Sequence, residues 1–93
     1  MGPEAKVERS VCKWAKAHGI LNLKLSGPNN RGIPDRAFLK GGKIVFIEFK
    51  APGKDPTALQ VKRMLELAEE GFAVKWYDNG WNAQKWLEQQ FGI

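Results

Sequence analysis

Two adjacent glycines, Gly41 and Gly42, separate two apolar segments and restrict the folds open to this chain more than any other feature. A Gly-Gly pair between apolar runs is typical of the two-residue turn that joins antiparallel strands. Residues 35–40 and 43–50 are therefore predicted to form a β-hairpin. The turn also fixes the register, because each residue before the glycines then faces a defined residue after them.

The hairpin register brings two acidic side chains together. Counting outward from the turn places Asp35 opposite Glu48, and Lys50 points to the same face of the sheet as Glu48. Facing residues have Cβ atoms only about 4.5–5.5 Å apart, and two carboxylates at that separation repel each other. Such a pair does not favour stability by itself. A divalent cation between the carboxylates would explain their position.

The composition indicates one folded, soluble domain that spans residues 1–93. Hydrophobic residues make up 43% of the chain and charged residues 27%, which is typical of a globular protein. No apolar run approaches the roughly 18–20 residues of a membrane span, and the N-terminus has no signal-peptide core. Cys12 is the only cysteine, which excludes an internal disulfide and a cysteine zinc site. We expect a cytoplasmic protein that does not associate with membranes.

The charge balance gives a moderate indication of a polyanionic partner. Fifteen basic and ten acidic residues leave a formal net charge of +5. Part of the excess lies on one face of a predicted helix near the N-terminus, at Lys6, Arg9, Lys13 and Lys16. A stripe of this kind suits an ordinary solvated face as well as direct ligand contact, and charge alone leaves both interpretations open.

Hydrophobic periodicity and turn residues predict elements in the order α-β-β-β-α-β-α. The helices are expected at residues 3–18, 56–70 and 82–91, and the strands at residues 20–25, 35–40, 43–50 and 72–77. A loop is predicted at residues 26–32. An antiparallel meander followed by a helical crossover favours a mixed sheet flanked by helices.

The second predicted helix carries more detailed expectations. Asp55 is the expected N-cap, and Pro56 the expected first helical residue. The side chains predicted to face the core are those of Ala58, Val61, Leu65 and Ala68.

The acidic pair and the lysine that follows it have the chemistry of a hydrolytic metal site. Mg²⁺ prefers oxygen ligands, and Asp35, Glu48 and the backbone carbonyl of Phe49 supply three of them. Lys50 is placed to orient or deprotonate a water molecule and to stabilise developing negative charge. A Glu-x-Lys pair on an edge strand would instead be an ordinary surface ion pair. The apolar run before Glu48 argues against that alternative, because buried charges need a partner or a metal.

Three polar residues outside the hairpin are candidates for the margin of this site. Glu8 lies at the flank of the apolar stripe of the first helix, although a glutamate near a helix N-terminus is also favourable without any further role. Glu4 lies one turn earlier and competes with Glu8 for the same place, but its position off the apolar flank favours Glu8. Gln60 lies on a flank of the second helix, where its spacing is equally consistent with a surface glutamine.

The order and spacing of these motifs resemble those of the PD-(D/E)xK nuclease superfamily. The resemblance is carried by Gly-Ile-Pro-Asp at residues 32–35, Ile-Glu-Phe-Lys at residues 47–50 and Gln60 in the following helix. More closely, nearly the whole chain resembles the virus-type replication-repair nuclease (VRR-NUC) domain. The resemblance implies a restriction-endonuclease-like α/β fold and a nuclease that depends on Mg²⁺ or Mn²⁺.

The resemblance also implies roles for individual residues. Asp35, Glu48 and Lys50 are expected to be catalytic, and Gln60 is expected to support the site. Glu8 is expected to complete the acidic set and is a further candidate metal ligand, directly or through a water molecule.

Single-domain members of this family resemble phage-type homodimers that act on branched DNA such as four-way junctions. We therefore expect a phage- or bacterium-encoded endonuclease that works as a homodimer in the host cytoplasm. Four tryptophans in so short a chain also favour a subunit interface, where tryptophan is enriched. The alternatives are a flap, nick or duplex endonuclease of the same superfamily, and a basic nucleic-acid-binding module that does not cleave. The residues predicted to contact DNA phosphates are Lys24, Asn30, Arg31, Lys54 and Lys62.

Overall fold

The computed structural model describes the whole chain, residues 1–93, and its elements follow the predicted order. They are α1 (Pro3–Ala17), β1 (Leu21–Lys24), β2 (Arg36–Lys40), β3 (Lys43–Phe49), α2 (Ala58–Glu69), β4 (Ala73–Tyr77) and α3 (Gly80–Phe91). The α-β-β-β-α-β-α order and the sheet flanked by helices are thereby confirmed. None of the helices has the combination of length and apolar character that crossing a membrane requires.

The four strands form one mixed sheet in the order β1-β2-β3-β4. Neighbours among β1, β2 and β3 are antiparallel, and β4 joins β3 in parallel after the crossover through α2. Gly41 and Gly42 form the turn between β2 and β3, with positive φ angles of 57° and 81° that favour glycine. Lys40 pairs with Lys43 across this turn, so the predicted register is confirmed.

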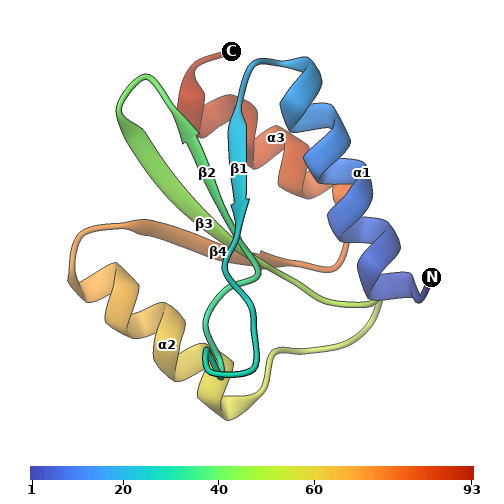
Figure 1. The fold of residues 1–93 in the computed structure, drawn as a ribbon, viewed down its shortest axis with the longest axis vertical. Helices are drawn as coiled ribbons and strands as arrows, with labels where there is room; N and C mark the ends of the chain where they lie inside the picture. The colour runs from blue at the N-terminus through green and yellow to red at the C-terminus, as the bar shows by residue number, and fades with distance from the viewer.

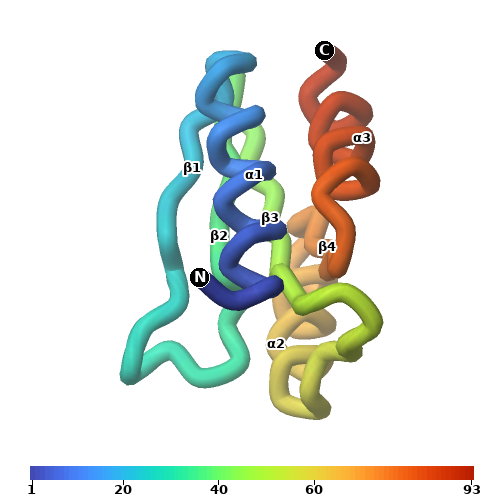
Figure 2. The backbone as a smooth tube through the Cα atoms, turned by 90° about the vertical axis from the view of Figure 1, so that its right-hand side faces the viewer, coloured from blue at the N-terminus to red at the C-terminus, as the bar shows by residue number.

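Helices α1 and α3 pack together against one face of the sheet and enclose the main core (Figure 1, Figure 2). From β3, Val45, Ile47 and Phe49 enter this core and are fully buried. Because successive side chains of a strand point to opposite faces, Phe46 and Glu48 point to the other face of the sheet. The alternation along β3 therefore separates the apolar core from the face that carries the acidic pair.

Helix α2 begins later than predicted. Its N-cap is Thr57, and the helix starts at Ala58, so the assignments of Asp55 as N-cap and Pro56 as first helical residue are wrong. The reason is a capping box, in which Thr57 and Gln60 each bond the backbone N–H group of the other. This reciprocal pair satisfies two backbone donors at once, which a cap at Asp55 would not do.

The buried face of α2 also differs from the prediction. Met64 is the only buried residue of this helix. The predicted core stripe is exposed to solvent at all four positions: Ala58, Val61, Leu65 and Ala68. Three of these residues instead line an apolar groove between α2 and β4. A single helix covers this part of the sheet, so only a narrow strip of the helix is buried.

Candidate active site

The acidic pair lies where the hairpin register places it. Arg36 pairs with Ile47 across β2 and β3, so the next facing pair outward is Asp35 and Glu48. The Oδ2 atom of Asp35 accepts a hydrogen bond of 2.9 Å from the backbone N–H group of Phe49. The backbone carbonyl of Asp35 accepts another, from the N–H group of Leu25. Asp35 is thus fixed through both its main chain and its side chain.

A close approach of the preceding loop to α2 sets the entry of the chain into β2. Gly32 has a φ angle of +77°, and a Cβ atom at this position would lie 2.7 Å from the Cγ atom of Leu59. The loop therefore requires glycine here for both its conformation and its contact with α2. Pro34, two residues later, is fully buried and anchors the chain immediately before Asp35.

Glu48 is the least satisfied group of the protein. Its residue is 2% exposed, and its buried Oε1 atom has no hydrogen-bond partner. Burial, and after it the charge of Asp35 and a hydrogen bond with Asp35, together raise the pKa of Glu48 to about 8. Lys50 opposes the shift only in part. An unpaired buried carboxylate oxygen is costly, so this atom marks a position where a ligand is expected.

Lys50 follows the end of β3 and points toward two polar side chains. Its Nζ atom donates a hydrogen bond of 3.4 Å to Oε1 of Gln60 and lies 3.8 Å from Oε1 of Glu4. The side chain of Lys50 is only 14% exposed, whereas that of Glu4 is half-exposed. Figures 1 and 2 show the start of α1 beside the connection that leaves β3. Residues from α1, β3 and α2 therefore meet around one ammonium group.

Gln60 links the site to the capping box of α2. Its Oε1 atom accepts from the backbone N–H group of Thr57 at 2.8 Å as well as from Lys50. The backbone N–H group of Gln60 in turn donates to Oγ1 of Thr57. The Thr-x-x-Gln spacing is readable in the sequence as a capping box, and this signal would have identified Thr57 as the residue that positions Gln60.

Glu8 takes part in a different network. Its Oε2 atom accepts hydrogen bonds from Nζ of Lys24 at 2.9 Å and from Nε of Arg36 at 2.7 Å. Burial acts to raise the pKa of Glu8, but the hydrogen bonds and charges of Arg36 and Lys24 outweigh burial and leave it below its usual value. The contact with Lys50 comes from Glu4 instead. The catalytic role of Glu8 stays a prediction, and Glu4 is the α1 carboxylate that the structure brings to Lys50.

Arg36 is a further residue of this region that sequence reasoning did not single out. It follows Asp35 directly and connects three elements, because it donates to Glu8 on α1 and to Oδ1 of Asn22 on β1. Nothing in the local sequence pattern distinguishes it from any other strand arginine, since its partners are distant in the chain. Its position beside Asp35 makes it part of the support of the site.

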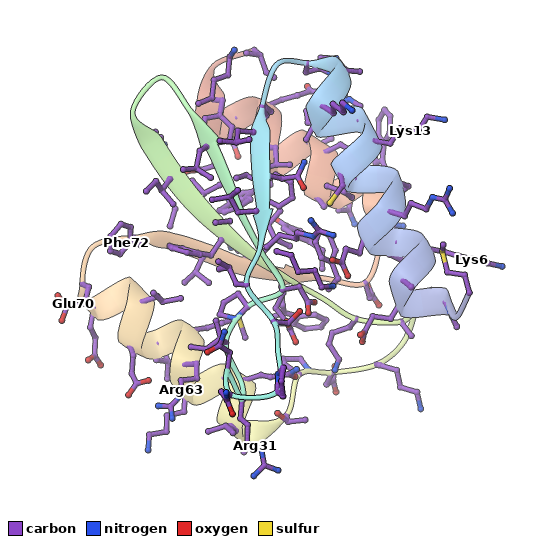
Figure 3. All side chains as sticks on the ribbon, in the orientation of Figure 1. Lys6, Lys13, Arg31, Arg63, Glu70 and Phe72 are labelled. Atoms are coloured by element: carbon purple, nitrogen blue, oxygen red, sulfur yellow. The ribbon has the colours of Figure 1, made fainter.

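The residues predicted to contact DNA fall into two groups. Lys24 is half-exposed and paired with Glu8, and Asn30 donates to the carbonyl of Leu25 within its own loop. The other three form no ion pair and are exposed to solvent: Arg31, Lys54 and Lys62. Figure 3 shows Arg31 projecting from the loop between β1 and β2, beside the start of α2.

The donor set around the acidic pair suits a hard divalent cation. No three Asp, Glu, His or Cys side chains converge closely enough to hold a metal ion by themselves. The available oxygen atoms are those of Asp35, Glu48 and the neighbouring main chain, and Mg²⁺ is commonly bound by one or two carboxylates completed by water and substrate oxygens. The unpaired Oε1 atom of Glu48 fits this mode of binding.

Comparison with known proteins identifies the class. No protein-family model matches the chain. A protein of Acyrthosiphon pisum secondary endosymbiont phage 1, named "Putative nuclease p44", is 36% identical over 72 residues, which are 76% of this chain and 77% of the phage protein. A solved structure described as "VRR_NUC domain" has a TM-score of 0.85 and 25% identity, and the match covers 98% of this chain and 100% of that chain.

These likenesses, together with the sheet and its acidic pair, define the chain as a nuclease domain with a restriction-endonuclease-like fold. Within that class, the chain belongs to the VRR-NUC family. The resemblance carried by the Gly-Ile-Pro-Asp and Ile-Glu-Phe-Lys segments is confirmed. A nuclease domain of this kind implies DNA as its substrate.

Proposed function

We propose that the protein is a Mg²⁺- or Mn²⁺-dependent endodeoxyribonuclease that hydrolyses phosphodiester bonds in branched DNA, including four-way junctions, as a homodimer. The observation that carries the metal-dependent chemistry is the buried Oε1 atom of Glu48, which has no partner and lies in the facing pair with Asp35. A binding module without catalysis would gain nothing from two facing carboxylates next to DNA phosphates.

The residues that would hold the cation are Asp35, Glu48 and the backbone carbonyl of Phe49. When bound, a divalent ion polarises a phosphoryl oxygen and makes a water molecule more acidic. Asp35 is already oriented for this role by the N–H group of Phe49. A bound cation would favour the ionised form of Glu48, because its positive charge would offset the repulsion from Asp35.

Lys50 carries the remaining chemistry of the proposed site. Its ammonium group is held by Gln60 and lies near Glu4, so it is fixed in place before substrate binds. From there it orients the attacking water molecule and stabilises the negative charge that develops on the phosphate. In the hydrolysis, the water oxygen forms a bond to phosphorus, one P–O ester bond breaks, and the proton that the water loses is balanced by protonation of the departing sugar oxygen. The exposed cations Arg31, Lys54 and Lys62 contact flanking phosphates.

Cleavage of labelled substrates tests this function. The protein is incubated with a four-way junction and with a linear duplex of the same sequence, with Mg²⁺, with Mn²⁺ or with chelator. We expect cleavage only with a divalent ion, and faster cleavage of the junction. Asp35→Asn and Lys50→Ala should remove it, whereas Lys43→Gln, at the opposite end of β3 from the acidic pair, should not. Preferred cleavage of the duplex or of a flap would show that branched DNA is not the main substrate. Binding without cleavage under every condition would show that the protein is a binding module and not a nuclease.

The proposed dimer is supported by exposed apolar surface. Trp81 is 64% exposed and Leu65 is 58% exposed, and the groove between α2 and β4 is lined almost entirely by apolar side chains. Two copies would present two active sites to the two strands of a branched substrate. The molecular mass from light scattering at the concentration of the cleavage assay checks this part of the proposal, and a monomer mass would refute the dimer without affecting the site.

A further inference from the structure

The outer face of α1 carries an uncompensated row of positive charge. Its cations are Lys6, Arg9, Lys13 and Lys16, which fall within about 80° of one another at roughly 100° per residue. All four are exposed, and none forms an ion pair. The two acidic residues of α1 point elsewhere, because Glu4 lies against Lys50 and Glu8 against Lys24 and Arg36. The helix therefore separates its charges between an inner and an outer side.

Helices α1 and α2 differ in their charge. Figure 3 shows Lys6 and Lys13 projecting from α1 on one side, while Glu70 lies at the end of α2 on the opposite side. Glu66 and Glu69 lie on α2 as well, together with Lys62 and Arg63, so α2 carries charges of both signs. The outer face of α1, in contrast, presents cations only.

The surface between these cations has a shallow, wide-open depression. A depression of about 410 Å³ is lined by Met1, Lys6, Arg9, Ser10 and Lys13. A second depression, of about 400 Å³, shares Met1 and Arg9 with the first and leads to Lys24 and Arg36, which are paired there with Glu8. Side chains that surround a concave surface can approach a phosphate group from several sides, whereas cations spread over a convex surface meet it one at a time.

The length and direction of this row fit a DNA backbone that leaves the active site. Lys6 and Lys16 are ten residues apart, which is about 15 Å along the helix axis. The phosphates of one strand advance about 3.4 Å each along the duplex axis, so the row spans about four to five phosphates. The helix starts beside Lys50, through the contact of Glu4, and runs away from it (Figure 1).

We propose that the outer face of α1 is a second DNA-binding surface, which holds the sugar–phosphate backbone of an arm that flanks the cleaved bond over about four to five nucleotides. The proposal rests on the proposed nuclease function and adds a surface to the loop and α2 residues predicted to contact DNA. The contacts are to phosphates, so the surface binds without reading sequence. Helix α1 would then bind the DNA arm with its outer face and pack against the core with its inner face.

Two triple variants with the same change in charge test the proposal. The first replaces the cations of α1 nearest the site, by Lys6→Gln, Arg9→Gln and Lys13→Gln. The matched control removes three cations from other elements, by Lys43→Gln, Lys75→Gln and Lys85→Gln. Binding of a short labelled duplex and of a four-way junction is measured by anisotropy over a salt series, with chelator present so that no cleavage occurs. Circular dichroism and thermal unfolding of both variants check that each is folded.

We expect the α1 variant to reduce the slope of log K against log [salt] by about 3, or about 1 for each lost phosphate contact, and the control to reduce it by less than about 1. Equal reductions in both variants would overturn the proposal, because they would reflect net charge alone. An unchanged slope in the α1 variant would overturn it as well. The nuclease function is judged separately by cleavage of the same substrates by the unmodified protein with Mg²⁺, so the failure of one is distinguishable from the failure of the other.

Discussion

Glu8 and Glu48 are two nearly buried glutamates with opposite surroundings. They are 8% and 2% exposed, respectively. Glu8 faces two cations, both of which donate to one of its oxygens. Glu48 faces a carboxylate and keeps one oxygen without a partner. The pKa of Glu8 is lowered, while that of Glu48 is raised to about 8. Burial is common to both glutamates, so the charge of the neighbouring side chains decides the direction of the pKa shift.

The contrast separates a cluster that supports the fold from one that we propose binds a ligand. The Glu8 network is complete as it stands and ties α1 to β1 and β2 through Lys24 and Arg36. The Asp35–Glu48 pair is incomplete, because the repulsion between its two carboxylates is relieved only when a proton or a cation is added. Substitutions in the two clusters are therefore expected to separate stability from activity.

The largest effect is expected on cleavage. Glu48→Gln keeps the shape of the side chain but removes a proposed metal ligand, so kcat with Mg²⁺ should fall by at least about 10²–10³-fold, comparable to the loss of one group that stabilises the transition state. Glu8→Gln, the matched change in the other cluster, should lower kcat by about 10-fold, as expected for an outer support. Single-turnover cleavage of a labelled junction measures both. Equal losses would place Glu8 in the catalytic set, as the family resemblance implies.

For stability, in contrast to cleavage, the substitution of Glu8 is expected to have a larger effect than the substitution of Glu48. Glu8→Ala leaves Lys24 and Arg36 without their carboxylate and should lower the free energy of unfolding by about 2–3 kcal/mol, as hydrogen bonds between charged groups do. Glu48→Gln should not lower it at neutral pH without metal, since it removes the cost of keeping a buried carboxyl group protonated above its unfolded pKa. Urea denaturation with chelator at neutral pH measures the two values. A larger loss of stability in Glu48→Gln than in Glu8→Ala would contradict the proposal that the Glu48 carboxyl group binds a ligand and does not stabilise the fold.

The pH dependence of stability should also differ between the clusters. Folded Glu48 keeps its proton up to about pH 8, whereas the unfolded chain releases it near 4.5. Unfolding between these values therefore releases a proton, and the contribution of Glu48 makes the metal-free protein less stable as pH rises through that window. Glu8, with its lowered pKa, contributes stability that is lost as pH falls below its unfolded value.

The difference in Tm between the unmodified protein and Glu48→Gln isolates this effect, because the other titrating groups are shared. With chelator present, the unmodified protein should lose Tm relative to the variant from about pH 5 to pH 8, and Mg²⁺ should reverse the loss. A constant difference over this range would show that burial and the charge of Asp35 do not raise the pKa of Glu48.

The smallest effect is expected for the capping box of α2, through which Gln60 holds Lys50. Neither Glu8 nor Glu48 contacts this capping box. Thr57→Ala removes half of the capping box and should cost about 1 kcal/mol of stability. It also frees Gln60, so kcat should fall modestly while the affinity for DNA stays constant. Thr57→Ser retains the hydroxyl group and serves as the control. Unchanged kcat in Thr57→Ala would separate the capping role of Gln60 from its contact with Lys50.

Local patterns in the sequence were sufficient to predict the hairpin and the facing acidic pair that the hairpin produces. The Gly41–Gly42 turn set the register of β2 and β3, and the register set Asp35 opposite Glu48, because strand pairing beyond a tight turn leaves no freedom. The Thr-x-x-Gln capping box was equally readable, since both of its bonds close within four residues. The helix nevertheless was assigned a start at Pro56, because Asp and Pro are also favourable at that position.

The remaining features depended on contacts between distant segments. The sequence alone determined the order of elements, the family and the facing acidic pair, because these follow from turns, periodicity and motifs of short range. Only the tertiary structure decided that Glu4 meets Lys50 and that Glu8 meets Arg36, 28 residues away in the chain. It also decided which side of α2 is buried. The rotation of a helix against a sheet is set by the packing of the whole core, so one side chain on a helical stripe is selected over its neighbour only when all the elements are in place.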